Sequence, residues 1–218
     1  MAYSKEEERF FTLLVQAIDV TADVNLLYAL SIAIQDSVRA IEGLPEHDHS
    51  PEVIWQLDDE CDQIENLLGL SFVVCQLYLT NIVSHCRHLH DFHERESGNR
   101  QLAGHNGEKK ELMQRCCIPI AGTSYTAITA IDAFANCFKH RDEWDYNWNS
   151  LKANALTTAT IIQSLGASSG STGNLRQGYS RIIGDDFQQV LRFGDILRDW
   201  AKALKAEYQE ELSNLSTS

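Results

Sequence analysis

The densest run of charged and aromatic residues in the chain is Asn136–Trp144, with the sequence NCFKHRDEW. An imidazole with a tunable pKa can act as general acid or base, and adjacent cations can stabilise charge that develops on a phosphoryl group. His140 is therefore the candidate general acid or base. Lys139 and Arg141 would bind phosphate, and Asn136 would orient the imidazole or hold a phosphate. Cleavage of RNA through its 2′-hydroxyl needs only such groups and no metal.

The same segment also has a structural interpretation. The charged residues from Lys139 to Glu143 can form a solvated, salt-bridged helix end, and Trp144 and Trp148 would then cover the core. Under this interpretation the chain is a non-enzymatic helical interaction protein, and these residues are surface or dimer contacts. Its expected sign is a large apolar face exposed on the monomer. The residues leave both interpretations open.

A second group of candidate ligands is His85–His93, with the sequence HCRHLHDFH. Imidazoles and a thiolate can bind zinc or another transition metal, so a metal-binding bundle is a third hypothesis. The run does not complete a tetrahedral set, and Arg87 and Asp91 have the spacing of an ordinary ion pair on a solvated helix. The Glu-x-x-His that a di-iron bundle requires occurs at Glu46 and His49, in a predicted loop. We therefore expect no metal and no cofactor.

Helical periodicity extends along most of the chain. In the first half of the chain we expect a helix that begins at a Ser4–Glu7 capping box, a helix over about 23–42, and a long helix from Ser50-Pro51 to about Leu89 with a kink at Gly69. In the second half we expect a short helical turn within 111–117 and a helix that begins near Thr123. Two further helices are expected, one capped by Asn149 or Ser150 and the last one capped by Asp185 or Asp186. The long helix should bury a stripe that starts at Ile54 and Leu57. No segment alternates with period two for long enough to predict a strand. The sequence thus predicts an all-α protein, a single antiparallel bundle of six to seven helices over residues 1–218.

Polar connections separate these helices. Residues 97–110 and 166–178 are predicted to be mobile loops, and 210–218 a polar tail. The glycines of 166–178 suggest a phosphate-binding loop, but no Gly-Lys-Ser/Thr and no preceding strand accompany them. We therefore set that interpretation aside.

Composition narrows the function classes. A net charge of −13 argues against a general nucleic-acid coat or a protein that binds anionic membranes, although a nuclease needs only a local cationic patch. The six cysteines lack regular spacing and indicate buried thiols in a reducing compartment. The longest apolar run, Leu70–Val83, is interrupted by polar residues and too short for a bilayer. We expect a soluble cytoplasmic protein without a membrane partner.

An all-α bundle with a helix that ends in Asn-x-x-Lys-His-Arg-Asp-Glu-Trp resembles the HEPN superfamily of prokaryotic helical proteins. Many members are metal-independent RNases of toxin–antitoxin or anti-phage systems. They act as dimers, in which an Arg and a His from each protomer, four to six residues apart, meet at the interface. A polar residue such as Asn often follows the Arg, and in this sequence Asn136 and His140 match the second and last positions of that motif. Ala135 stands where the family has Arg, and Arg141 is the candidate to replace it.

A second match to the motif is the pair Arg87 and His93, with five intervening residues. The resemblance implies a homodimer, an RNA substrate and a cognate protein partner such as an antitoxin. The missing Arg at position 135 implies the alternative of a degenerate, non-catalytic member that serves in dimerisation or binding.

Overall fold

The computed structural model describes residues 4–19, 25–144 and 147–217. Within these ranges the chain is all-α, and isolated bridges take the place of strands. The helices are α1 (Lys5–Ala17), α2 (Asn25–Glu42), α3 (Pro51–Ser97), α4 (Lys109–Gln114), α5 (Ala127–Lys139), α6 (Ala153–Ser164), α7 (Asn174–Ile182) and α8 (Arg192–Thr217), with the short 3₁₀ turns η1 (Arg141–Glu143), η2 (Trp148–Ser150) and η3 (Phe187–Gln189).

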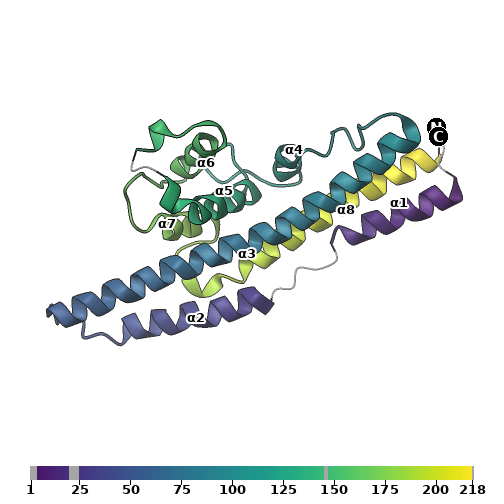
Figure 1. Ribbon diagram of the computed structural model, residues 1–218. Helices are drawn as coiled ribbons and strands as arrows, with labels where there is room; N and C mark the ends of the chain where they lie inside the picture. Colours follow the sequence, from purple (N-terminus) through teal and green to yellow (C-terminus); the bar gives the residue numbers. More distant parts are fainter. Residues whose placement is uncertain (1–3, 20–24, 145–146, 218) are drawn as a thin grey trace.

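The 47-residue helix α3 runs the length of the molecule. Helices α1 and α2 follow each other along one side of it, and α8 lies beside its second half (Figure 1). Helices α4–α7 form a cluster on the other side, which α5 and α7 join to α3. The largest fully buried side chains come from all of these parts: Trp200, Tyr179, Tyr208, Phe11, Phe72 and Phe134. One continuous core therefore follows α3.

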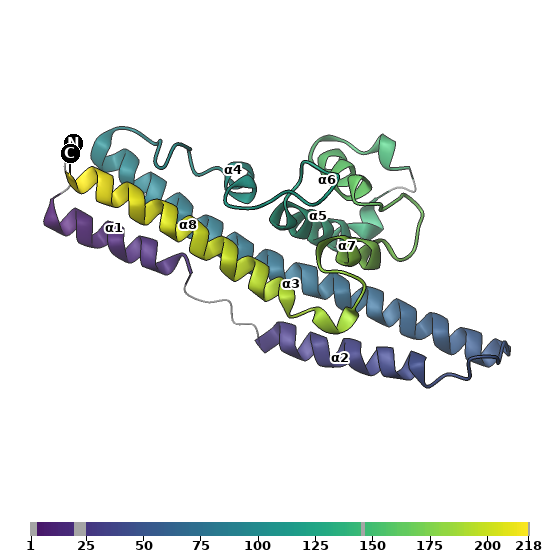
Figure 2. The same cartoon turned by 180° about the vertical axis from the view of Figure 1, so that it is seen from behind.

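The helices around α3 do not all oppose it, so the predicted antiparallel bundle is wrong for α8. Phe10 of α1 packs on Phe92 near the end of α3, as an antiparallel neighbour should. By contrast, Phe72 of α3 packs on Phe193 and His90 binds Tyr208, so α8 advances in the same direction as α3. The view from behind shows the same course (Figure 2). The reason is the α4–α7 cluster, which returns the chain to the middle of α3 before α8 begins.

Helix α3 continues through Gly69 as one unbroken helix. A Cβ at this position would lie 2.2 Å from the ring of Phe138, so the glycine allows α5 to approach α3 closely. The predicted inner stripe is correct from Ile64 onward. The earlier positions Ile54 and Leu57 are exposed, because α2 covers only part of this first section of α3.

The predicted start of α1 is confirmed, whereas the predicted start of α8 is not. Ser4 and Glu7 form the capping box: the Ser4 Oγ accepts from the Glu7 amide at 3.3 Å, and the Ser4 amide donates to the Glu7 carboxylate at 2.6 Å. Asp186 does act as a cap, but of the turn η3, and α8 begins only at Arg192.

The predicted loops and tail are more structured than expected. Helix α7 begins at Asn174, inside the predicted loop 166–178, and α8 continues to Thr217 through the predicted polar tail. In segment 97–110, Leu102 and His105 are buried. These polar stretches are helical or packed because partners from distant segments hold them, which local composition does not reveal.

Helix α3 also has the length and composition of a membrane span, with a mean hydropathy of 1.7 over its most apolar stretch. Half of that stretch is buried inside the molecule.

Candidate functional site

The predicted catalytic residues lie at the end of α5, which is buried from Ile128 to Ala135. Asn136 belongs to a polar network between helices. The Gln76 amide of α3 donates to Asn136 Oδ1 at 2.9 Å and to Asp132 Oδ1 at 2.6 Å, and Lys109 Nζ donates to the same Asp132 oxygen at 2.7 Å. The Asn136 side chain is thus held by α3 and connects α5 to its neighbours.

The other three candidates lie at or just after the end of α5, where the Lys139 side chain is exposed. His140 caps the end of α5 with its side chain 48% exposed, and its Nδ1 lies 3.1 Å from a Glu143 carboxylate oxygen. The Arg141 guanidinium donates to Asn66 Oδ1 of α3 at 2.8 Å and stacks on the Phe138 ring, 4.8 Å from its centroid. Asn136, His140 and Arg141 thus each have a different side-chain partner, namely Gln76, Glu143 and Asn66.

Arg141 faces a cavity of about 500 Å³ between α3, the end of α5 and the segment before α7. Trp144 and Trp148 contact each other edge to face and line this cavity, as does Phe138. These residues belong to one segment of the sequence, whereas nothing in the sequence predicted the opposite wall, which includes Asn66.

Glu65 of α3 forms part of that wall and caps α7. Its carboxylate accepts from the Leu175 amide at 2.7 Å and from the Arg176 amide at 3.1 Å, and lies 3.4 Å from the Arg176 guanidinium. A carboxylate of the chain itself thus occupies the position that an anion would take at this helix N-terminus. This agrees with setting aside a phosphate-binding loop here.

The fallback pair Arg87 and His93 does not form a site within one chain. Arg87 is exposed, with its guanidinium 3.6 Å from a carboxylate oxygen of Glu108. His93 is buried, and burial lowers its pKa. The two side chains leave α3 on different sides, so the match to the motif is a correct spacing without a shared surface.

Two histidines of the run His85–His93, His90 and His93, lie in the core. His90 Nε2 lies 2.9 Å from the Tyr208 hydroxyl, and its Nδ1 lies 2.9 Å from the Arg100 carbonyl oxygen. The His105 ring lies 4.7 Å from the His90 ring, and burial lowers the pKa of both imidazoles, that of His105 to about 4. Burial also raises the pKa of the adjacent Cys86 thiol to about 12. In the described ranges, no three His, Cys, Asp or Glu side chains are grouped as metal ligands.

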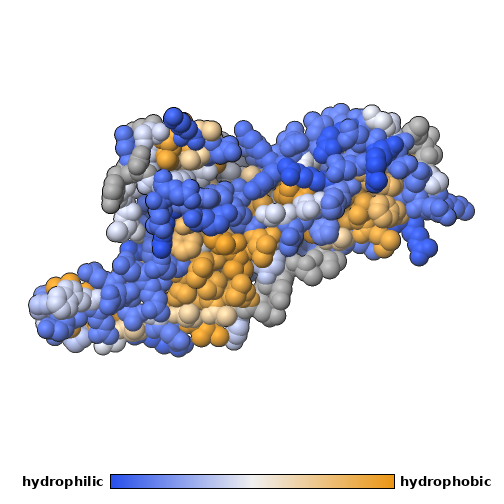
Figure 3. All heavy atoms as spheres, viewed as in Figure 1, coloured by the Kyte–Doolittle hydropathy of each residue, from blue (hydrophilic) through white to orange (hydrophobic). Residues whose placement is uncertain are grey.

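A different surface stands out on the middle of α3. Leu70 and Leu77 are 44% and 60% exposed, and Val73 between them is half-buried. We call this set of three residues the α3 face. Figure 3 shows that the apolar surface over the middle of α3 continues onto α2. The signal in the sequence was that Leu70 and Leu77 fall outside the inner stripe, which Phe72, Cys75 and Leu79 occupy.

Comparisons with known proteins add no relative to this description. The chain matches no protein-family model, and no curated protein and no solved structure is significantly similar to it.

Proposed function

We propose that this protein is a non-catalytic helical interaction module that binds a protein partner through the α3 face. The observation that carries the proposal is the exposure of Leu70 and Leu77 on the central helix, where their apolar area would be removed from water by a docked surface. An isolated exposed leucine is ordinary, but these two lie two helical turns apart on the same side of a long helix.

The contacts of the predicted catalytic residues also support a non-catalytic function. Asn136 is engaged by Gln76, and Arg141 is engaged by Asn66. Each has a structural partner, as expected for residues that join helices. The free thiols of the described cysteines fit a reducing compartment, so the proposal includes a cytoplasmic location.

The first test replaces an apolar contact of the α3 face. Leu77→Asp should leave the fold intact, because the side chain is exposed, and should abolish binding of the cognate partner by placing a charge in a desolvated contact. Cross-linking in cells followed by mass spectrometry of the tagged full chain measures the complex. The matched control is Leu156→Asp on α6, where Leu156 is 42% exposed. Equal complex formation by both variants would reject the α3 face as the binding surface.

A second candidate function is a HEPN-like, metal-independent ribonuclease. The observation that favours it is the half-exposed His140 with a carboxylate of Glu143 at hydrogen-bond distance from Nδ1. That contact leaves Nε2 as the atom that would exchange a proton with an RNA 2′-hydroxyl. The missing Arg and phosphate ligands would have to come from a second subunit.

The ribonuclease proposal has its own test. His140→Ala should reduce cleavage of RNA in EDTA by about 100-fold or more, the usual contribution of a general acid or base. The control is His47→Ala, since His47 is exposed in the loop between α2 and α3. Absence of wild-type cleavage, or cleavage that His140→Ala leaves unchanged, would count against His140 as a catalytic residue.

A further inference from the structure

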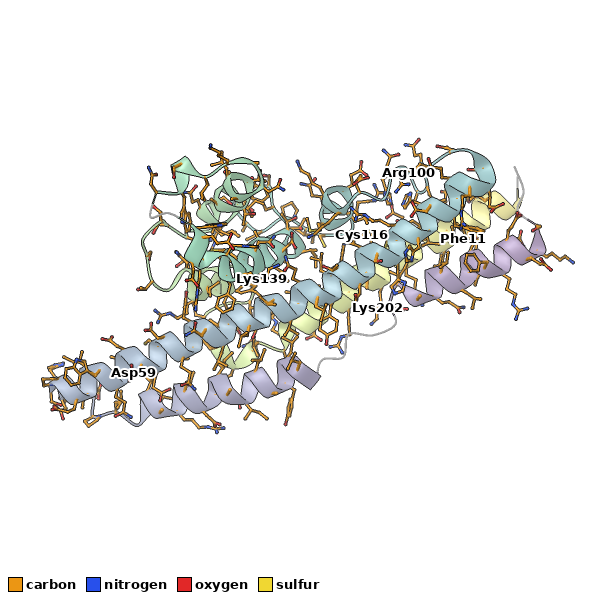
Figure 4. All side chains as sticks on the ribbon, in the orientation of Figure 1. Phe11, Asp59, Arg100, Cys116, Lys139 and Lys202 are labelled. Atoms are coloured by element: carbon orange, nitrogen blue, oxygen red, sulfur yellow. The ribbon has the colours of Figure 1, made fainter. Side chains whose placement is uncertain are left out.

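The charges of α3 are distributed unequally on the two sides of the α3 face. From Pro51 to Ser84 the helix has acidic side chains and no Lys, Arg or His. Its acidic residues here are Glu52, Asp58, Asp59, Glu60, Asp62 and Glu65. The basic side chains, Arg87 and Arg95 with His85 and His88, all lie beyond that stretch. Figure 4 shows Asp59 near the N-terminal end of α3 and Arg100 beside its opposite end.

One acidic and one basic residue of α3 lie at equal distances along the sequence from Val73, the centre of the α3 face. Asp59 lies fourteen residues before Val73, and Arg87 lies fourteen residues after it. Asn66 and Thr80 complete a row at seven-residue spacing, which stays on one side of a helix because seven residues make nearly two turns. Leu70 and Leu77 flank Val73 in this row. Val73 is also close to the midpoint of α3, which spans residues 51 to 97.

This row is available for a partner. Asp59, Asn66, Thr80 and Arg87 are exposed, as are Leu70 and Leu77, and Asn66 Oδ1 also accepts from the Arg141 guanidinium at 2.8 Å. The stretch from Asp59 to Arg87 makes about eight helical turns, and its central portion of about four turns, from Asn66 to Thr80, contains both leucines. The Arg87 ion pair with Glu108, at 3.6 Å on the surface, leaves the guanidinium 46% exposed. Asp91 and Glu94, the acidic side chains near Arg87, are already paired with Arg100.

We propose that the partner of the α3 face is a second copy of this chain, packed so that the two α3 helices run antiparallel about a two-fold axis near Val73. This inference rests on the proposed function, of which it names the partner. The antiparallel arrangement places Asp59 of each copy near Arg87 of the other, and Leu70 of each copy near Leu77 of the other. A parallel arrangement would instead place Asp59 beside Asp59 and Arg87 beside Arg87, which repel.

The dimensions suit such a pair. Helix α3 is about 70 Å long at 1.5 Å per residue. Helices that pack through seven-residue rows cross at a shallow angle of about 20°, so contact continues for several turns on each side of the crossing point. The small polar side chains at Thr80 and Ser84 permit a close approach. Apolar residues at the centre and opposite charges at both ends are the usual design of a self-complementary two-fold interface.

The experiment is sedimentation equilibrium of the full-length chain over a range of concentrations. Wild type should be a dimer, and Leu77→Asp should weaken dimerisation by at least about tenfold. Asp59→Arg and Arg87→Glu should each weaken it by about tenfold, since each makes both end contacts repulsive. The chain with both reversals should recover the wild-type affinity to within a few-fold, because opposite charges face each other again.

Circular dichroism verifies that each variant is folded, and Asp36→Arg serves as the control charge reversal, on the exposed face of α2. A wild-type chain that stays monomeric, or a double reversal as weak as the single ones, would overturn the antiparallel dimer. A monomer whose Leu77→Asp variant still loses its cellular partner would overturn this inference alone and leave the interaction function intact. A dimer that Leu77→Asp leaves unchanged, with an unchanged cellular complex, would reject both.

Discussion

His105 is almost fully buried, with 4% of its surface exposed, and only one of its ring nitrogens has a hydrogen-bond partner among the described residues. Its Nδ1 accepts from the Gly107 amide at 3.1 Å, which fixes the proton on Nε2. The rings of His90 and Tyr208 lie next to it, each within 6 Å. A proton added to this cluster would place a charge where water cannot solvate it. The cluster is therefore neutral in the folded protein.

This neutrality predicts acid sensitivity. The folded-state pKa of His105 lies near 4, below its ordinary value of 6.5, so the unfolded chain binds the proton more tightly. The stabilisation from the neutral ring is complete above pH 6.5 and is lost as the pH falls from 6.5 toward 4. By linkage, the loss amounts to roughly 3 kcal/mol at pH 4.

Urea unfolding of wild type and His105→Asn at several pH values measures this effect. The variant should be less stable at pH 7 but should lose less stability on acidification. His47→Asn, on an exposed histidine, should follow wild type. Parallel stability curves for wild type and His105→Asn would contradict the assignment.

Sequence analysis could identify these histidines but not their role. Their type and spacing are compatible with metal binding, catalysis or burial. The residue that decides is Tyr208, 118 positions after the His90 side chain that it contacts. A contact at that separation leaves no local trace in the sequence.

At the scale of elements, the closest approach between α3 and α5 occurs where Gly69 meets the ring of Phe138. We expect Gly69→Ala to destabilise the protein by roughly 1–3 kcal/mol, although alanine is the better helix former, because the added methyl group overlaps the ring. Thermal unfolding measures the change. Combining it with Phe138→Leu should recover part of the loss, since the smaller side chain leaves room for the methyl group. A Gly69→Ala variant more stable than wild type would show that the two helices can separate without cost.

The sequence predicted the helices that end on local signals and missed the one that does not. Ser4 with Glu7 marks the start of α1, and Ser50 before Pro51 marks the start of α3. Helix α7 begins after Gly173, whose backbone is left-handed with a φ of 83°. The side chain that caps this helix is that of Glu65, which lies 110 residues before the Leu175 amide that it binds. Glycines and serines around it suggest a loop, and only the folded protein supplies the carboxylate.

At the scale of the molecule, the all-α class followed from periodicity, whereas the direction of α8 did not. An amphipathic stripe indicates which side of a helix is buried, but it does not indicate whether the helix packed on that side runs parallel or antiparallel to it. The direction depends on the α4–α7 cluster, which places Phe193 beside Phe72 and so starts α8 at the middle of α3. The exposure of the α3 face also depends on the arrangement of the helices, because none of the described helices packs over Leu70 and Leu77.

The parallel course of α8 also has a consequence for biosynthesis. Phe72 and His90 contact Phe193 and Tyr208 of α8, so their burial is complete only when α8 packs on α3, and α8 is translated after every other described helix. Throughout synthesis of the segment from 98 to 191, the second half of α3 would leave the ribosome with its apolar side uncovered. The nascent chain is then a natural client for chaperones that shield such surfaces, and it is released from that need when Tyr208 reaches His90.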